Sequence, residues 1–316
     1  MTKNSQLIEN SRPQHFLSID GLEKQFLVDI LDDAKKFASS SNFDTQNSHL
    51  LSNHLAVNLF FEDSTRTRMT FEIAAKRLGA TVLSPNSTRL STQKGETILD
   101  TARTLKSMGA TILIVRDSSS GTPHLIANHL GEGIHVINAG DGRHAHPTQA
   151  MLDMFTIRQQ KGDIAQLRFA IVGDILHSRV ARSQIHALNT LGAKEVRVIA
   201  PKTLLPTEID RLGVTALTDL DAGIAGVDVI MVLRLQLERM QGQLIPSTQE
   251  YFRCYGLTID RLARAAPEAV VMHPGPINRG LEIASDVADS ERSLILSQVA
   301  NGIAVRMAIM AKLACV

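Results

Sequence analysis

The chain has 316 residues, which is enough for two domains that each bury a core of their own. Its 33 lysines and arginines against 32 acidic residues leave a net charge of +1, so bulk charge gives no reason to expect a nucleic-acid partner. Apolar runs are too short to cross a membrane, and two cysteines do not make a disulfide framework. We therefore expect a cytoplasmic protein with no membrane partner.

Short apolar runs alternate with amphipathic stretches along most of the chain, which is typical of a parallel α/β fold. The expected strands are Val57–Phe61, Thr81–Leu83, Thr111–Val115, His135–Ile137, Arg168–Val172, Glu195–Ile199, Asp228–Leu233 and Ala269–Met272. The expected helices include Arg66–Leu78, Glu96–Met108, Pro147–Gln159, Arg179–Leu191 and Ile295–Leu313.

We expect two domains, each a parallel sheet flanked by helices. A polar stretch around residues 159–166 separates the two series of strands and helices. It places the boundary between a domain of residues 1–158 and one of residues 159–316. The last helix is a candidate to pack back on the first domain.

The first polar cluster runs from Ser64 to Arg68, where an apolar strand gives way to a helix. Backbone N–H groups at a helix N-terminus lack intrahelical partners, and the helix dipole adds positive charge there. With the hydroxyls of Ser64, Thr65 and Thr67 and the guanidinium of Arg66, these groups suit a phosphate. The alternative is that Ser64 and Thr67 only cap the helix.

Other polar residues follow the later strands of both series. Arg116 comes after one apolar strand, and Lys94 beside Gly95 ends a polar loop. In open α/β sheets ligands bind beyond the carboxyl ends of strands, so Arg116 is a candidate binding residue. An exposed structural arginine and a solvated lysine are the alternatives.

A second strong cluster spans residues 138–149 and includes His144, His146 and Gln149. The two histidines invite a metal-binding interpretation, but Pro147 ends any strand there and no further ligand set stands out. We expect no metal and no cofactor, and a neutral His146 that donates a hydrogen bond to a carbonyl oxygen.

Three more clusters lie in the second series. The Gly173 turn before Arg179 lacks the glycine spacing of a dinucleotide site, so no nucleotide cofactor is predicted. Arg234 and Gln236 follow the next strand, and a stiff proline-glycine loop of residues 273–280 follows the last one. The recurrence of polar clusters at strand ends favours an active site over a set of ordinary turns.

Together these motifs resemble the aspartate/ornithine carbamoyltransferase family, and within it the aspartate branch. The resemblance rests on Ser-Thr-Arg-Thr-Arg at residues 64–68, His-Pro-Thr-Gln at 146–149, Arg-Leu-Gln at 234–236 and His-Pro-Gly-Pro at 273–276. Ornithine enzymes usually carry a cysteine in the second of these motifs and a His-Cys-Leu-Pro loop, and this chain has neither.

The resemblance implies transfer of a carbamoyl group from carbamoyl phosphate to L-aspartate, an early step of pyrimidine synthesis. It implies a homotrimer with shared active sites, and catalytic roles for Arg66, Thr67, Arg116 and His146. Substrate-binding roles carry over to Ser64, Thr65, Arg66, Thr67, Ser91, Lys94, Arg116, His146, Gln149, Arg179, Arg234, Gln236, Gly275 and Pro276. Of these, Ser91 and Lys94 would reach a neighbouring subunit's site.

One departure from the family pattern is Asp63, which stands where proline is common and places a carboxylate beside the phosphate site. The Asn-Arg-Gly loop at 278–280 and the polar N-terminus resemble a bacterial branch that assembles with dihydroorotase or an inactive relative of it. Two alternatives remain open: another amine acceptor such as ornithine, and a metal-dependent amidohydrolase built on His144 and His146.

Overall fold

The computed structural model describes residues 6, 13–39, 48–85, 95–237, 240 and 244–315. Two of the residues singled out from the sequence, Ser91 and Lys94, lie outside these ranges. The chain divides into two compact units, one of Met1–Met151 with Asn301–Val316 and one of Leu152–Ala300. Each unit holds one parallel sheet with helices against it, so the predicted fold class is confirmed.

The first unit is built on a four-stranded sheet in the order β2-β1-β3-β4, with all neighbours parallel. The strands are β1 (Leu55–Phe60), β2 (Thr81–Leu83), β3 (Ile112–Asp117) and β4 (His135–Asp141). The helices are α1 (Lys24–Ser39), α2 (Thr65–Arg77), α3 (Ile98–Ser107) and α4 (Thr122–Leu130), with the start of α5 (Pro147–Lys161) and the end of α11 (Ile295–Ala314).

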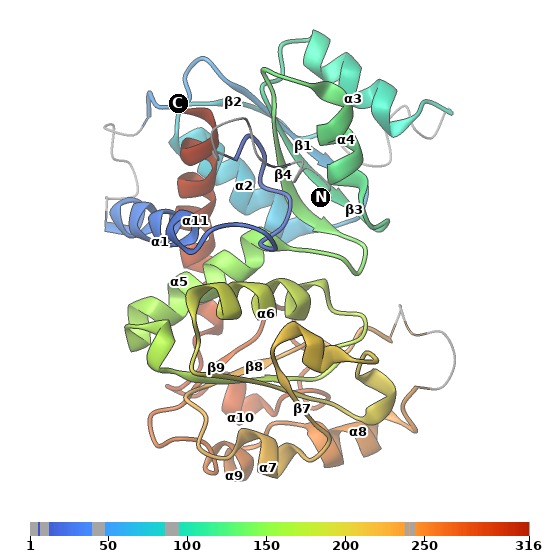
Figure 1. Cartoon of the computed structure of the whole chain (residues 1–316), viewed down its shortest axis with the longest axis vertical. Coiled ribbons are helices and arrows are strands. Elements are labelled where there is room, and N and C mark those ends of the chain that lie inside the picture. The colour runs from blue at the N-terminus through green and yellow to red at the C-terminus, as the bar shows by residue number, and fades with distance from the viewer. Residues whose placement is uncertain are drawn as a thin grey trace. The chain divides into compact units, whose positions relative to one another are not determined.

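Alternate strand residues of this sheet face different helices. Val57, Leu59, Leu113 and Val115 are fully buried in one cluster with apolar residues of α3 and α4. Figure 1 shows α1, α2 and the end of α11 on the other side of the sheet. Because helices cover both faces of the sheet, the strand sequences are continuous apolar runs, which is the expected pattern for a buried parallel sheet.

Residues 301–314 of α11 are held in the first unit by charged side chains. Lys312 Nζ lies 2.9 Å from a carboxylate oxygen of Asp29 on α1. The guanidinium of Arg306 lies 4.9 Å from the ring centre of Phe71 on α2, within the range of a cation–π contact. These contacts tie the last helix of the chain to the first two.

The second unit is built on a five-stranded parallel sheet in the order β7-β6-β5-β8-β9. The strands are β5 (Arg168–Val172), β6 (Glu195–Ile199), β7 (Thr215–Leu217), β8 (Val229–Val232) and β9 (Val270–Met272). The helices are α6 (Arg179–Leu191), α7 (Leu220–Ile224), α8 (Thr248–Tyr255), α9 (Ile259–Leu262) and α10 (Ser285–Ala288), and short 3-10 turns cover Ile164–Gln166, Lys202–Leu204 and Ile209–Leu212.

The sequence missed β7 and ended β3 too early. β7 has only three residues and lies at the sheet edge with no buried side chain, so no apolar run marks it. The predicted strand Thr111–Val115 extends to Asp117, so Arg116 lies within β3. Pairing explains the extension, because the Phe61 N–H donates to the Arg116 carbonyl oxygen at 2.8 Å.

Within the described ranges, no helix is both long enough and apolar enough to cross a membrane.

Gly79 and Gly109 have similar backbone conformations but different surroundings. Comparing substitutions at the two positions therefore isolates the steric cost of an added Cβ. Both follow a helix with positive φ, +85° and +94°. A Cβ on Gly79 would lie 1.9 Å from the Ser48 carbonyl oxygen, whereas one on Gly109 would meet nothing within 4 Å. We expect Gly79→Ala to lower the free energy of unfolding by at least about 2 kcal/mol more than Gly109→Ala, measured by urea denaturation. Equal losses would contradict the steric argument.

His15 should make stability fall at acid pH. Burial, reinforced by His135 and His124, lowers the pKa of His15 from 6.5 to about 4, and its Nδ1 accepts the Val136 N–H at 3.1 Å. Below pH 6.5 the unfolded chain therefore binds a proton that the folded chain does not. Between pH 6.5 and 4 this difference should remove up to about 3 kcal/mol of stability.

The measurement compares unfolding free energies of wild type and His15→Asn across that pH range, because an Asn side-chain oxygen can still accept the Val136 N–H. The variant should lose less stability on acidification than wild type. His129→Asn, at an exposed position on α4, should keep the wild-type slope. The role assigned to His15 is wrong if all three proteins show the same slope.

Candidate active site

The N-terminus of α2 has the composition of the anion site expected from the sequence. Ser64 occupies the N-cap position with extended backbone, but its side chain makes no capping hydrogen bond. The first turn contains no acidic residue and instead carries Arg66, while Thr67 is buried. The simple capping alternative for Ser64 is therefore not what the structure shows. A site of this kind combines backbone N–H groups, hydroxyls and a positive dipole end.

Arg116 lies beside this helix start through strand pairing, since Phe60 of β1 is its partner in register. One terminal nitrogen donates to the Ala139 carbonyl oxygen of β4, and the other lies 3.3 Å from a Glu62 carboxylate oxygen. The side chain is 12% exposed. The guanidinium is thus held at the carboxyl ends of three adjacent strands, β1, β3 and β4.

His146 and Gln149 come from the start of α5, just beyond β4, and both are buried. The hydroxyl oxygen of Thr148 lies 3.5 Å from His146 Nδ1, which is at the outer limit for a hydrogen bond. Because β1, β3 and β4 are neighbouring parallel strands, the residues that follow them lie along one edge of the sheet. The first unit therefore brings Ser64–Thr67, Arg116, His146 and Gln149 to the same edge.

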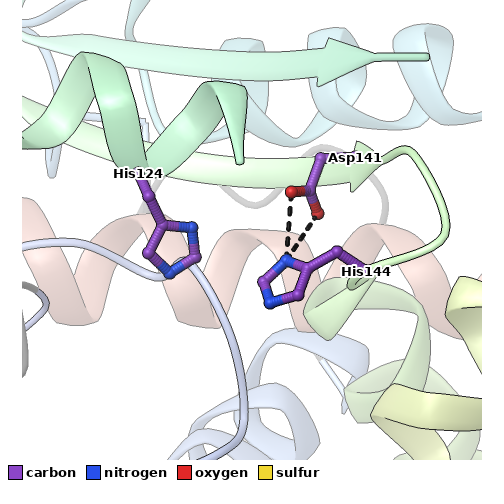
Figure 2. A group of neighbouring side chains, drawn as sticks. All are labelled: His124, Asp141 and His144. Atoms are coloured by element: carbon purple, nitrogen blue, oxygen red, sulfur yellow. Dashed lines mark hydrogen bonds and ion pairs between the residues drawn. The ribbon is translucent and has the colours of Figure 1, made fainter. Parts of the chain in front are cut away.

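His144 is grouped with residues other than His146. Its Nδ1 lies 3.0 Å from a carboxylate oxygen of Asp141, and its ring contacts that of His124 edge-on at 5.3 Å between centres. Figure 2 shows His124 on α4 and Asp141 at the end of β4 on either side of the His144 ring. Among the described residues, the group that could hold a metal is His124, Asp141 and His144.

Electrostatics within this group are set by burial and hydrogen bonding. Burial acts to raise the pKa of Asp141, but hydrogen bonds from His144, the Gly121 N–H and Asn138 outweigh it and lower that pKa below its usual value. Burial, together with the neighbouring His144, lowers the pKa of His124. Asp141 is accordingly an ionised carboxylate with no exposed surface at neutral pH.

In the second unit, Arg179 is the first residue of α6 and is buried. The Ser178 hydroxyl caps the helix by accepting the Ala181 N–H at 3.1 Å, and the first turn again contains no acidic residue. The preceding loop is rigid because the Asp174 carboxylate accepts from both the backbone N–H and Nδ1 of His177. A buried guanidinium thus stands at the positive end of a capped helix.

Arg234 and Gln236 follow β8, which pairs with the strand that precedes the Arg179 loop. β8 and β5 are neighbours, and the Leu233 N–H continues the ladder by donating to the Val172 carbonyl oxygen at 2.8 Å. The Gln236 amide nitrogen then donates to the His177 carbonyl oxygen at 3.4 Å. The segment after β8 and the loop before α6 are therefore joined at the carboxyl edge of the second sheet.

Five other helices differ from α2 and α6 in the charge of their first turn, whereas α1, α4, α5 and α11 also carry no acidic residue there. Acidic residues occupy the first turn in α3, α7, α8, α9 and α10, namely Asp100, Asp221, Glu250, Asp260 and Asp286. That choice complements the helix dipole, whereas an arginine in the first turn opposes it. The first turns of α2 and α6 contain Arg66 and Arg179 instead, a pattern that suits an anion at each helix start.

The loop that carries Gly275 and Pro276 is fixed by a buried polar network. The Gly275 N–H donates to His273 Nδ1 at 2.8 Å, so the ring proton is on Nε2, which lies 3.2 Å from the Glu282 carboxylate. The same Glu282 oxygen accepts the Asn278 N–H at 2.7 Å. One carboxylate oxygen therefore holds both ends of the loop.

The network continues inward to Asp153 of α5. The Gln298 side chain accepts the His273 N–H at 3.0 Å and donates to Asp153 at 2.7 Å, while Gln184 donates to the other oxygen of Asp153 at 2.6 Å. Sequence reasoning missed Glu282, Gln298 and Asp153. Only Asp153 carries a sequence signal, because it is a lone acid within the apolar run Met151–Phe155.

Glu282 should be essential to the shape of this loop. Glu282→Ala leaves the Asn278 N–H and His273 Nε2–H without their acceptor in a buried site, which should lower the free energy of unfolding by about 3 kcal/mol. Glu282→Gln keeps an oxygen that can accept both bonds, so its loss should be clearly smaller. Chemical denaturation of the two variants measures the difference, and a smaller loss for Ala than for Gln would contradict the assigned bonds.

Comparison with known proteins places the chain in a family. The carbamoyl-P binding domain of aspartate/ornithine carbamoyltransferases matches residues 14–159, and the Asp/Orn binding domain of the same family matches residues 165–313. Between them the two matches span nearly the whole chain.

Solved structures agree with this assignment. Aspartate transcarbamoylase from Trypanosoma cruzi, in complex with carbamoyl aspartate and phosphate, is 28% identical with a TM-score of 0.84 over 97% of both chains. Ornithine carbamoyltransferase from Pyrococcus furiosus is also 28% identical, with a TM-score of 0.83 over 96% of this chain and 97% of that one. The chain belongs to the aspartate/ornithine carbamoyltransferase family and is a carbamoyltransferase.

Proposed function

We propose that this protein transfers the carbamoyl group of carbamoyl phosphate to the amino group of L-aspartate, giving N-carbamoyl-L-aspartate and phosphate. The observation that carries the proposal is the pair of helices, α2 and α6, that contain an arginine in the first turn, where the helix dipole favours acids. One substrate is an acyl phosphate anion and the other a dicarboxylate, so each unit has a cationic helix start for one of them.

The phosphate of carbamoyl phosphate would bind at the start of α2. Ser64, Thr65, Arg66 and Thr67 supply hydroxyls, backbone N–H groups and a guanidinium there, at a helix end that the Ser64 side chain does not cap. Asp63 is exposed beside this site. Its side chain must point away from the phosphate, because a nearby carboxylate would repel it.

Thr67, Arg116 and His146 would stabilise the carbamoyl oxygen as negative charge develops on it during attack by the amine, with Gln149 positioning the carbamoyl group. The strand pairing that holds Arg116 and the burial of His146 preorganise these donors. Fixed donors of this kind typically contribute about 3 kcal/mol each to catalysis. No covalent enzyme intermediate is required, and the leaving phosphate can accept the proton of the amine.

Aspartate fits the second unit better than ornithine does. Arg179 and Arg234 follow neighbouring strands and offer one cation for each carboxylate of aspartate, with Gln236 joined to the same loop. Ornithine has one carboxylate and a second, cationic amine, which two arginines would repel. The Asp174 carboxylate at this edge is hydrogen-bonded to His177, so it serves to hold the loop and not to bind a cationic amine. Gly275 and Pro276 would present carbonyl oxygens to the carbamoyl amide and the attacking amine.

The proposal includes an assembly and a cellular role. Ser91 and Lys94 would complete the active site of a neighbouring subunit in a homotrimer, so that each interface is heterologous and the ring closes. The reaction would serve pyrimidine biosynthesis in the cytoplasm. A dihydroorotase, or an inactive chain related to one, would be the protein partner. The support for these points is the family resemblance of the Lys94 and Asn278–Gly280 segments.

The amine acceptor is tested by measuring ureido product with carbamoyl phosphate and either L-aspartate or L-ornithine. We expect turnover with aspartate and at most trace product with ornithine. Arg234→Ala should lower kcat/KM for aspartate by about 100-fold, since a charge-assisted bond to a carboxylate is lost. The KM for carbamoyl phosphate should change far less.

The matched control is Arg264→Ala, which removes an arginine of the same unit that is 58% exposed and pairs with Asp221. It should leave both kinetic constants near wild type. Preferential turnover of ornithine would overturn the aspartate proposal. Equal changes of both KM values in Arg234→Ala would mean that Arg234 supports the fold and does not bind the acceptor.

A further inference from the structure

The group of His124, Asp141 and His144 has the dimensions of a metal site. One potential ligand atom from each residue lies within 4.8 Å of those of the other two. The ring centres of the histidines are 5.3 Å apart. Two imidazoles bound to one tetrahedral Zn²⁺ also have ring centres about 5 Å apart, because each Zn–N bond is about 2 Å long. The rings are therefore spaced as ligands of a single ion.

The contact between His144 and Asp141 fits the same geometry. His144 Nδ1 lies 3.0 Å from Asp141 Oδ2. Two ligands at about 2 Å from one metal are separated by about 3 Å, so an ion can replace the proton that these atoms share. Asp141 is prepared for this role, since Asn138 and the Gly121 and Ala145 N–H groups orient its oxygens at 2.7–3.1 Å. Such supporting bonds are what hold ligands at metal sites.

The third residue of the group, His124, has a ring nitrogen that is not hydrogen-bonded to any described residue. Within the described part of the chain, His124 Nδ1 is buried and has no hydrogen-bond partner. A buried polar atom without a partner costs about 1–3 kcal/mol, and such exceptions in native proteins require an explanation. A bound ion would satisfy this nitrogen. The side chain of His144 is 40% exposed, which leaves a path for the ion and room for a water ligand.

We propose that His124, Asp141 and His144 form a binding site for a divalent transition-metal ion of the Zn²⁺ class. Two imidazoles and a carboxylate suit Zn²⁺ and its spectroscopic substitute Co²⁺, whereas Mg²⁺ and Ca²⁺ prefer oxygen ligands alone. The site shares His144 with the metal interpretation of the sequence, but its other members are His124 and Asp141 and not His146.

The ion would link two segments of the first unit. His124 lies in the first turn of α4, and Asp141 and His144 lie at the end of β4 and in the loop before α5. That loop leads directly to His146. The ion would thus join α4 to the segment that places His146, and its role would be to hold that segment.

The test uses the full-length protein after removal of metal with a chelator. Calorimetric titration with Zn²⁺ should show one site per chain with a dissociation constant of about 1 μM or tighter. Co²⁺ should give the visible absorption of a low-coordinate nitrogen and oxygen site. Zn²⁺ should also raise the thermal unfolding midpoint, because it binds the folded state.

His124→Ala and His144→Ala should each weaken Zn²⁺ binding by at least about 100-fold and abolish the Zn²⁺-dependent rise in unfolding midpoint. The matched control is His129→Ala, an exposed histidine on the same helix, which should bind Zn²⁺ as wild type does. Absence of stoichiometric binding to wild type would overturn the proposal. So would binding that is reduced equally, or not at all, in the three variants. None of these measurements depends on carbamoyl transfer.

Discussion

Both units depend on one electrostatic feature. In each, an arginine side chain lies at the N-terminus of a helix, where the helix dipole is positive. At the start of α2 and of α6, guanidinium groups occupy a position where other helices of the chain carry acids. Each such position is unfavourable by roughly 0.3–1 kcal/mol per charge when the site is empty. An anionic ligand at such a position would offset this term and could accept hydrogen bonds from backbone N–H groups of the first turn. Under the proposed function, anion binding would therefore make the charge arrangement at each helix start more favourable.

The parallel sheets make this arrangement possible. Each strand of a parallel sheet delivers its following loop to the same edge, so residues far apart in sequence, such as Phe60, Arg116 and Ala139, become neighbours. In the second unit the edge is stiffened from within, because Asp153 binds Gln298, which in turn holds the backbone of His273. A buried carboxylate is tolerated there because amide donors reach both of its oxygens. The polar network thereby fixes the loop of Gly275 without using the residues expected to touch substrate.

The sequence predicted the two parallel sheets and the strand ends that carry polar residues, because buried strands and amphipathic helices have clear periodicities. It did not predict β7, which has no buried side chain, or the full length of β3, which depends on pairing with strands on both sides. The sequence also did not predict contacts between side chains that are far apart along the chain. Nothing near Glu282 in the sequence points to His273, and nothing near His124 points to His144, since these pairs exist only after the chain has folded. The residues assigned to substrate remain predictions, because their roles rest on chemistry and family resemblance.

Fold similarity does not decide the amine acceptor. The chain is 28% identical to an aspartate transcarbamoylase and 28% identical to an ornithine carbamoyltransferase, with TM-scores of 0.84 and 0.83. The backbone is thus common to both activities, and specificity must depend on a few side chains at the edge of the second sheet. A second arginine there favours a second carboxylate and disfavours a second amine by the same Coulomb interaction, so one residue both selects aspartate and rejects ornithine. Under the proposed function, Arg179 and Arg234, which follow two strands that are hydrogen-bonded to each other, would supply that pair of charges.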